Sequence, residues 1–220
     1  MSGPSLVGVI PLNALDRAKS RLAGALTPEE RRALTLWLAG RTLAALHESG
    51  VVERVAVVSS DVVALAWAAE HGAEPLAQQG RGLNAGLALA RAWAIKLEAG
   101  ALLIALGDLP LLTGDEVRRF IAMGRLHERL IALAPDRARD GTNLSLARPP
   151  ALAPLAYGRG SYARHRGLAR RAGVPALLFR APGAAFDVDG PADLDELIAV
   201  GLWRPAVQET SGATHAREGV

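Results

Sequence analysis

Three aspartates stand where their carboxylates could hold a divalent cation. Asp108 follows the apolar run Ala101–Leu106, where the end of a buried strand would hold a carboxylate firmly. Asp187 and Asp189 are separated by one residue, and in an extended segment such residues point the same way. Neighbouring carboxylates repel each other unless a cation such as Mg²⁺ or screening water lies between them. The sequence therefore predicts a Mg²⁺ site formed by Asp108 with one or both of the later aspartates.

Two of these aspartates have an alternative role as helix caps. The helix expected after Thr113 begins too far along the chain for Asp108 to cap it, and Thr113 or Asp115 is better placed. Asp189 nearly adjoins the helix expected from Pro191, so it could cap that helix, bind the cation or do both.

Lys19 is an unusual cation for this chain. All 25 basic residues except Lys19 and Lys96 are arginine. Lys19 lies in the loop after the first expected strand, where a compact ammonium could bind a phosphate as a point charge. Chance retention of a lysine in a surface loop is the alternative. Lys96 lies on an expected helix and is interpreted as a surface charge.

Asparagine is equally rare and marks the same kind of place. The chain has three, Asn13, Asn84 and Asn143, each in or beside an expected loop. Asparagine favours turns for local reasons. The glycines next to Asn84 and Asn143 favour a functional site at those two positions.

A glycine-rich turn, Tyr157–Gly160, leads into a helix that opens at Ser161. Free backbone N–H groups and the positive end of the dipole make such a helix end suitable for an anion. The alternative is an ordinary helix with Ser161 as its N-cap. The nearby Thr142, Arg137 and Arg139 favour a phosphate.

Composition excludes several classes of protein. The 220 residues carry a net charge of +3, and the cations alternate with acids, which disfavours nucleic-acid binding. The absence of cysteine excludes disulfides and thiolate sites. We find no membrane-length apolar run, signal peptide, P-loop motif, dinucleotide-binding motif or zinc-ligand spacing of histidines, and expect a cytoplasmic protein.

Short aliphatic segments alternate with longer segments of helical period. Strands are expected at Leu6–Ile10, Arg54–Ser59, Ala101–Leu106, Leu130–Ala134, Asn143–Ala147 and Ala176–Phe179. Helices are expected from Pro28, with Thr27 and Glu30 forming a capping box, and at Asp61–His71, Gly86–Leu97, Gly114–Gly124, Tyr162–Ala172 and Pro191–Val200.

This alternation predicts one α/β domain over residues 1–203, with a mostly parallel, doubly wound sheet and a disordered tail at 204–220. Ligands of such sheets bind beyond the carboxyl ends of the strands, where the residues singled out above are expected.

In their order along the chain, these segments resemble the 2-phospho-L-lactate guanylyltransferase family of coenzyme F420 biosynthesis, whose bacterial members accept phosphoenolpyruvate. The resemblance covers about residues 6–200. Gly107 stands where the family commonly has alanine, and Tyr157 and Tyr162 where it has phenylalanine. The matching segments are Ile10–Pro11, Ala18–Leu22, Leu26–Arg31, Gly82–Asn84, Asp108–Pro110, Gly141–Asn143, Gly158–Ser161 with His165, and Asp187–Asp189 with Pro191–Leu194.

The resemblance implies a nucleotidyltransferase, or glycosyltransferase-A-like, three-layer fold. It implies that GTP, with Mg²⁺, reacts with phosphoenolpyruvate or 2-phospho-L-lactate and releases pyrophosphate. It assigns catalysis to Lys19, Arg21 and Asp108, nucleotide binding to Pro11, Lys19, Gly82 and Asn84, acceptor binding to Thr142, Gly158 and Ser161, and the metal to Asp108, Asp187 and Asp189.

Two other functions stay open. A related nucleotidyltransferase could use GTP with 3-phosphoglycerate, a sugar phosphate or the molybdenum cofactor, and a non-catalytic relative could bind the nucleotide only. The acceptor-side motifs disfavour the first and the three aspartates disfavour the second. The expected partners are small-molecule substrates, with neither nucleic acid nor membrane, and a homodimer is a further possibility.

Overall fold

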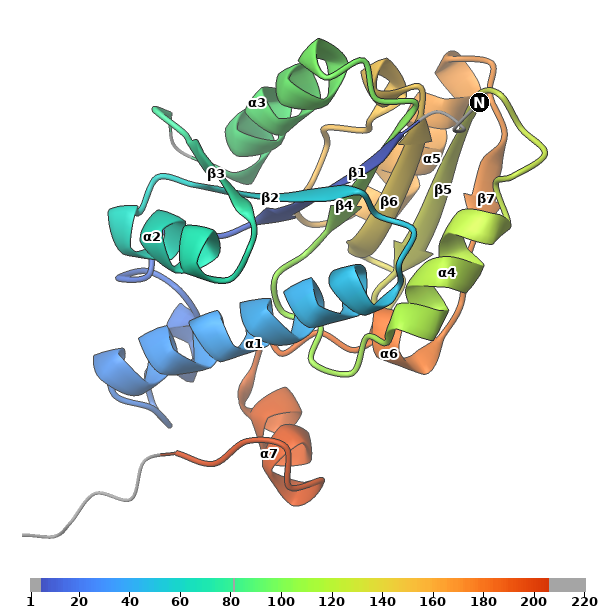
Figure 1. The fold of residues 1–220 in the computed structure, drawn as a ribbon. Helices are drawn as coiled ribbons and strands as arrows, with labels where there is room; N and C mark the ends of the chain where they lie inside the picture. Colours follow the sequence, from blue (N-terminus) through green and yellow to red (C-terminus); the bar gives the residue numbers. More distant parts are fainter. Residues whose placement is uncertain (1–4, 81, 206–220) are drawn as a thin grey trace, which may run out of the picture.

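The computed structural model describes residues 5–80 and 82–205, whose strands form one seven-stranded sheet (Figure 1). The strand order is β3-β2-β1-β4-β6-β5-β7. Strand β6 runs antiparallel to both its neighbours, and the other pairs are parallel, so the mostly parallel sheet is confirmed. The strands are β1 (Leu6–Pro11), β2 (Arg54–Ser59), β3 (Glu74–Ala77), β4 (Ala101–Ala105), β5 (Leu130–Pro135), β6 (Thr142–Arg148) and β7 (Ala176–Leu178).

Helices cover both faces of the sheet and complete the three predicted layers (Figure 1). One face packs against α1 (Pro28–Glu48), α2 (Val62–Glu70), α4 (Gly114–Ala122) and the short α6 (Pro182–Ala185). The other face packs against α3 (Leu83–Lys96) and α5 (Ser161–Arg171). Helix α7 (Pro191–Ala199) packs on α1, and single 3₁₀ turns lie at Ser20–Leu22 and Pro150–Leu152.

The burial of strand β4 on both faces of the sheet explains why its sequence is apolar throughout. Leu102 and Ile104 belong to the core under α3, whereas Leu103 and its small neighbours belong to the core under α1, α2 and α4. Successive side chains of a strand point to opposite faces, so a strand covered on both sides needs apolar residues at every position. The carboxyl end of this buried strand is a rigid place for a functional loop.

The predicted helix caps of α1 and α4 are confirmed, and α2 has a side-chain cap as well. In α1, the Glu30 N–H donates to Thr27 Oγ1 (3.2 Å) and the Thr27 N–H donates to Glu30 Oε2 (2.8 Å). Asp61 accepts from two N–H groups at the start of α2, and Thr113 caps α4. Asp108 therefore has no capping role at α4, as its distance along the chain predicted.

Three local predictions were incomplete. Strand β3 was missed because it is short, contains Pro75 and lies at the sheet edge, where a missing N–H is tolerated. The four-residue α6 was too short to show a period. Helix α3 begins at Leu83 instead of Gly86, because Gly82 turns the chain with a φ of 95°, so Asn84 lies in the first helical turn.

Most of the tail expected at 204–220 lies outside the described residues. In the ranges that the structure describes, none of the helices combines the length and apolar character needed to cross a membrane.

The capping box gives a stability prediction. Thr27→Ala removes the acceptor for the Glu30 N–H and should lower the free energy of unfolding by about 1 kcal/mol. For a chain of this size the melting temperature should fall by about 2–4 °C. Urea and thermal unfolding measure both. Glu29→Ala leaves both bonds of the box in place and should cost clearly less, and an equal loss in the two variants would contradict the role of the box.

Candidate functional site

A cleft of about 260 Å³ opens beyond the carboxyl ends of β1 and β4. Ligands of doubly wound sheets bind at this edge of the sheet. Among its lining residues are five that the sequence singled out: Pro11, Lys19, Arg21, Asp108 and Asp189. The structure thus brings the predicted cations and two of the predicted metal ligands into one cleft.

Two backbone hydrogen bonds fix the loop that carries Asp108. The Leu109 N–H donates to Thr42 Oγ1 of α1 (3.3 Å), and the Val188 N–H donates to the Asp108 carbonyl (3.2 Å). Gly107 is packed so closely that a Cβ there would lie 2.5 Å from Leu12 Cδ2. The loop after β4 is therefore tied directly to the segment that bears the other two aspartates.

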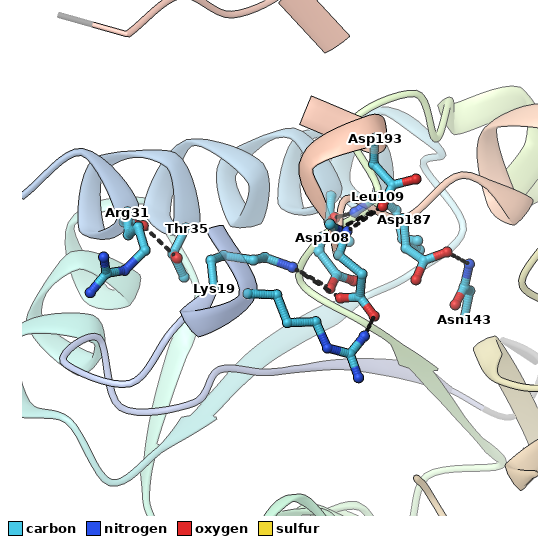
Figure 2. A network of polar contacts seen from close by, with 12 residues as sticks. Lys19, Arg31, Thr35, Asp108, Leu109, Asn143, Asp187 and Asp193 are labelled. Atoms are coloured by element: carbon cyan, nitrogen blue, oxygen red, sulfur yellow. Dashed lines mark hydrogen bonds and ion pairs between the residues drawn. The ribbon is translucent and has the colours of Figure 1, made fainter. Parts of the chain in front are cut away.

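Lys19 forms the central ion pair of the cleft (Figure 2). Its Nζ lies 2.7 Å from Asp108 Oδ2 and 3.6 Å from Asp189 Oδ1. Burial alone would lower the pKa of the Lys19 ammonium, but the charge and hydrogen bond of Asp108, with the charge of Asp189, raise that pKa above its usual value. The backbone of Lys19 is left-handed (φ 49°), a costly conformation for a residue with a side chain.

Asp187 lies behind Asp108, and the two carboxylates repel each other. Burial, followed by the charge of Asp108, raises the pKa of Asp187 to about 7. Asn143 Nδ2 donates to Asp187 Oδ1 (3.2 Å), which works in the opposite direction (Figure 2). Asp108 Oδ1 is buried and has no hydrogen-bond partner within residues 5–80 and 82–205. A buried, unpartnered carboxylate oxygen beside a second carboxylate is the chemistry expected of a cation ligand.

These carboxylates suit a Mg²⁺ ion that is bound jointly by the protein and a substrate. Within residues 5–80 and 82–205, no three acidic or histidine side chains are grouped closely enough to hold a metal by themselves. Protein Mg²⁺ sites commonly use one or two carboxylates and complete the shell with phosphates and water. Asp108 and Asp187, with Asp189 at the rim, suit that arrangement.

Asp189 is not the cap of α7. Asp193 Oδ2 accepts from the N–H groups of both Asp189 (3.0 Å) and Gly190 (2.8 Å), so the Asp189 carboxylate is free to face the cleft. There it lies 3.4 Å from Arg21 as well as near Lys19. The alternative of Asp189 as a helix cap is therefore wrong, because Asp193, in the first turn of the same helix, has that role.

The acceptor-side residues come together, but they do not line this cleft. Ser161 Oγ donates to Thr142 Oγ1 (3.4 Å), and His165 Nδ1 lies 3.1 Å from the same oxygen. Thr142 and Ser161 are buried, and Gly158, shortly before Ser161, is exposed. Asn143 follows Thr142 and contacts Asp187, so this cluster adjoins the metal carboxylates.

The helix end at Ser161 differs from its prediction. Gly160 is the N-cap (φ 69°), and Ser161 is the first helical residue. The Gly160 N–H donates to the Asp140 carboxylate, and the N–H groups of Ser161 and Tyr162 donate to the carbonyls of Gly158 and Asp140. These donors are therefore not free for a ligand, because the preceding turn supplies their acceptors.

Two more predicted residues are bonded elsewhere. Arg137 donates to both carboxylate oxygens of Glu196 (2.6 and 2.7 Å) and lies over the Phe186 ring, so it fastens α7 instead of reaching toward a phosphate. Asn84 pairs with the backbone of Tyr157 and is absent from the cleft lining. Its neighbour Gly82 lines a small hollow together with Pro11.

Sequence reasoning missed two residues that position the aspartates. Asn143 was singled out by its glycine-rich surroundings but received no role, and it orients Asp187. Thr42 was not singled out, and it is fully buried with its hydroxyl accepting from the Asp108 loop. A polar residue inside an apolar stripe was the available signal.

Comparison with known proteins shows the family of the chain. Residues 6–206 match the family model described as "Guanylyl transferase CofC like". The phosphoenolpyruvate guanylyltransferase of Sphaerobacter thermophilus is 48% identical over 87% of this chain and 91% of its own length. That of Rubrobacter xylanophilus is 41% identical over 90% of this chain and 95% of its own length.

Solved structures show the same fold at low sequence identity. A nucleotidyl transferase from Methanothermobacter superimposes with a TM-score of 0.66 at 15% identity, covering 91% of this chain and 99% of that one. A 4-diphosphocytidyl-2C-methyl-D-erythritol synthase from Anaerococcus prevotii gives 0.62 at 9% identity, with 92% and 100% coverage. The expected nucleotidyltransferase fold is thus confirmed, and the chain belongs to the CofC-like guanylyl transferase family.

Proposed function

We propose that this protein transfers the guanylyl group of GTP to phosphoenolpyruvate and releases pyrophosphate, as a step of coenzyme F420 biosynthesis. The observation that carries the proposal is the cleft in which Lys19 and Arg21 face Asp108 and Asp189, with Asp187 behind. The names of the relatives favour phosphoenolpyruvate over 2-phospho-L-lactate. The proposal includes a cytoplasmic location, and a homodimer stays a prediction.

The reaction needs placement and charge neutralisation more than proton transfer. A phosphate oxygen of the acid attacks the α-phosphorus of GTP, and the bond from that phosphorus to the bridging oxygen of pyrophosphate breaks. The second pKa of a phosphate monoester is about 6, so the attacking oxygen is already ionised at neutral pH. No general base is required. Catalysis comes from aligning two mutually repelling polyanions and stabilising the leaving pyrophosphate.

The residues of the cleft divide this work. Asp108, with Asp187 or Asp189, would hold Mg²⁺, which supplies charge neutralisation at the α-phosphate. Lys19 and Arg21 lie in the same cleft and would bind the β- and γ-phosphates in place of their present carboxylate partners. Pro11 and Gly82 line the neighbouring surface on the nucleotide side.

The acceptor acid is assigned to Thr142, Gly158 and Ser161. Their closeness to each other and, through Asn143, to Asp187 supports this assignment. Since both hydroxyls are buried and bonded to each other, the acid must displace that bond in order to bind.

Pyrophosphate release tests the function itself. Purified protein is incubated with GTP, Mg²⁺ and one acid at a time: phosphoenolpyruvate, 2-phospho-L-lactate or 3-phosphoglycerate. The proposal expects pyrophosphate with phosphoenolpyruvate above all. Turnover with 3-phosphoglycerate alone would identify that acid as the acceptor. No pyrophosphate release with any acid would favour a binding protein without catalysis.

Substitution of the metal carboxylates should abolish most of the turnover. Asp108→Asn and Asp187→Asn should each lower kcat by at least ~100-fold, because each removes a charge that holds the metal. The fold should survive, as judged by circular dichroism. Asp195→Asn, on the exposed part of α7, is the matched control. Wild-type turnover of either variant at saturating Mg²⁺ would exclude that residue as a ligand.

Lys19 should act on the triphosphate and not on the acid. Lys19→Ala should raise the KM for GTP and slow pyrophosphate release, with little change in the KM for the acid. Lys96→Ala removes the only other lysine of the chain and should change neither constant. Selective loss of acid binding in Lys19→Ala would contradict the assignment.

Substitution of Ser161 distinguishes a binding role of its hydroxyl from a structural role. If its hydroxyl binds the acid, Ser161→Ala removes a charge-assisted hydrogen bond of about 1.5–3 kcal/mol. The KM for the acid should then rise about tenfold to a hundredfold, with the KM for GTP unchanged. A purely structural hydroxyl predicts a lower melting temperature and an intact acid KM. Tyr162→Phe, at the next position, should keep both constants.

A further inference from the structure

Asn84 makes a two-bond clamp on a distant backbone. The Tyr157 N–H donates to Asn84 Oδ1 (2.8 Å), and Asn84 Nδ2 donates to the Tyr157 carbonyl (3.1 Å). The side-chain amide thus pairs with one residue of backbone as a neighbouring strand would. An amide is suited to this because it offers a donor and an acceptor side by side. The bonds join the first turn of α3 to the segment just before Gly158.

A second residue, from α5, holds the same segment. The Ala156 N–H donates to His165 Nε2 (3.3 Å). Since a backbone N–H can only donate, Nε2 carries no proton, and Nδ1 therefore carries it and donates to Thr142 Oγ1 (3.1 Å). Burial, with the charge of Arg164, lowers the pKa of His165 to about 4, so the ring keeps this neutral form at physiological pH.

Tyr157 completes the attachment. Its hydroxyl lies 2.8 Å from Ser145 Oγ of β6, and the edge of its ring packs against His165 with 4.6 Å between ring centroids. Residues 156 and 157 are therefore fixed by β6 and α5 on one side. On the other side, Asn84 fastens them to the helix whose first residues, Gly82 and Leu83, line the nucleotide side of the site.

We infer that Asn84 is a positioning residue for the acceptor acid and does not itself contact the nucleotide. By holding Tyr157, it sets the place of Gly158–Ser161 relative to the first turn of α3. This role differs from the nucleotide contact that the family resemblance implies for Asn84. The identity of the two substrates in this inference rests on the proposed function. The two hydrogen bonds of the clamp do not depend on that function.

Steady-state kinetics with both substrates varied test the assignment. Asn84→Ala should raise the KM for phosphoenolpyruvate about tenfold and leave the KM for GTP within about twofold, because only the acceptor segment loses its anchor. Gln79→Ala is the matched control: it removes an exposed amide from the segment before α3 that has no hydrogen-bond partner among the described residues, and it should behave as the wild type. A raised KM for GTP with an unchanged acid KM would overturn the inference and return Asn84 to the nucleotide.

Hydrogen exchange tests the clamp without any catalysis. In the substrate-free protein, Asn84→Ala should speed exchange of the Tyr157 amide at least tenfold, while amides of β4 keep wild-type rates. Unchanged exchange at Tyr157 would overturn the inference whatever the kinetics show. Absence of pyrophosphate from the wild type with every acid would overturn the proposed function and with it the role in acid binding, and the exchange rates would still show separately whether the clamp exists.

Discussion

The repulsion among three carboxylates is the constraint on which the rest of this structure depends. Asp108, Asp187 and Asp189 stand together at the carboxyl edge of the sheet, and Lys19 is the cation that compensates them. Such a group is stable only if each member is held in place and the negative charge is balanced. In the proposed reaction, a metal-bound triphosphate would replace Lys19 as the partner of these carboxylates.

Much of the surrounding fold can be understood as support for that cluster. The loop after the buried β4 carries Asp108, and α1 fastens that loop through Thr42. Asp193 takes over the capping of α7 and leaves the Asp189 side chain free. The antiparallel direction of β6 is equally important, because it brings the beginning of that strand, instead of its end, to the carboxyl edge of β4. Thr142 and Asn143 thereby lie beside the aspartates, and the proposed acceptor half of the site meets the proposed nucleotide half.

The sequence predicted the layers, most elements and the grouping of the three aspartates, because each of these leaves a local pattern. Apolar runs mark buried strands, Thr-Pro-Glu-Glu marks the start of α1, and the rare Lys19 marks the cleft. Contacts between distant residues leave no such pattern. The pairing of Asn84 with Tyr157, the bond of Arg137 to Glu196 and the use of the α5 N–H groups by Asp140 all depend on how loops meet in space. For the same reason the free helix end predicted at Ser161 was wrong.

Phosphorus NMR of the complete reaction mixture tests the central claim most directly, since it identifies both the bond that forms and the bond that breaks. With GTP, Mg²⁺ and phosphoenolpyruvate, the account predicts that the three GTP signals decline together. Pyrophosphate and a new pair of coupled diphosphate signals, from the guanylyl group joined to the acid, should grow in equal amounts. Release of orthophosphate with intact phosphoenolpyruvate, or no change in any signal, would contradict the account.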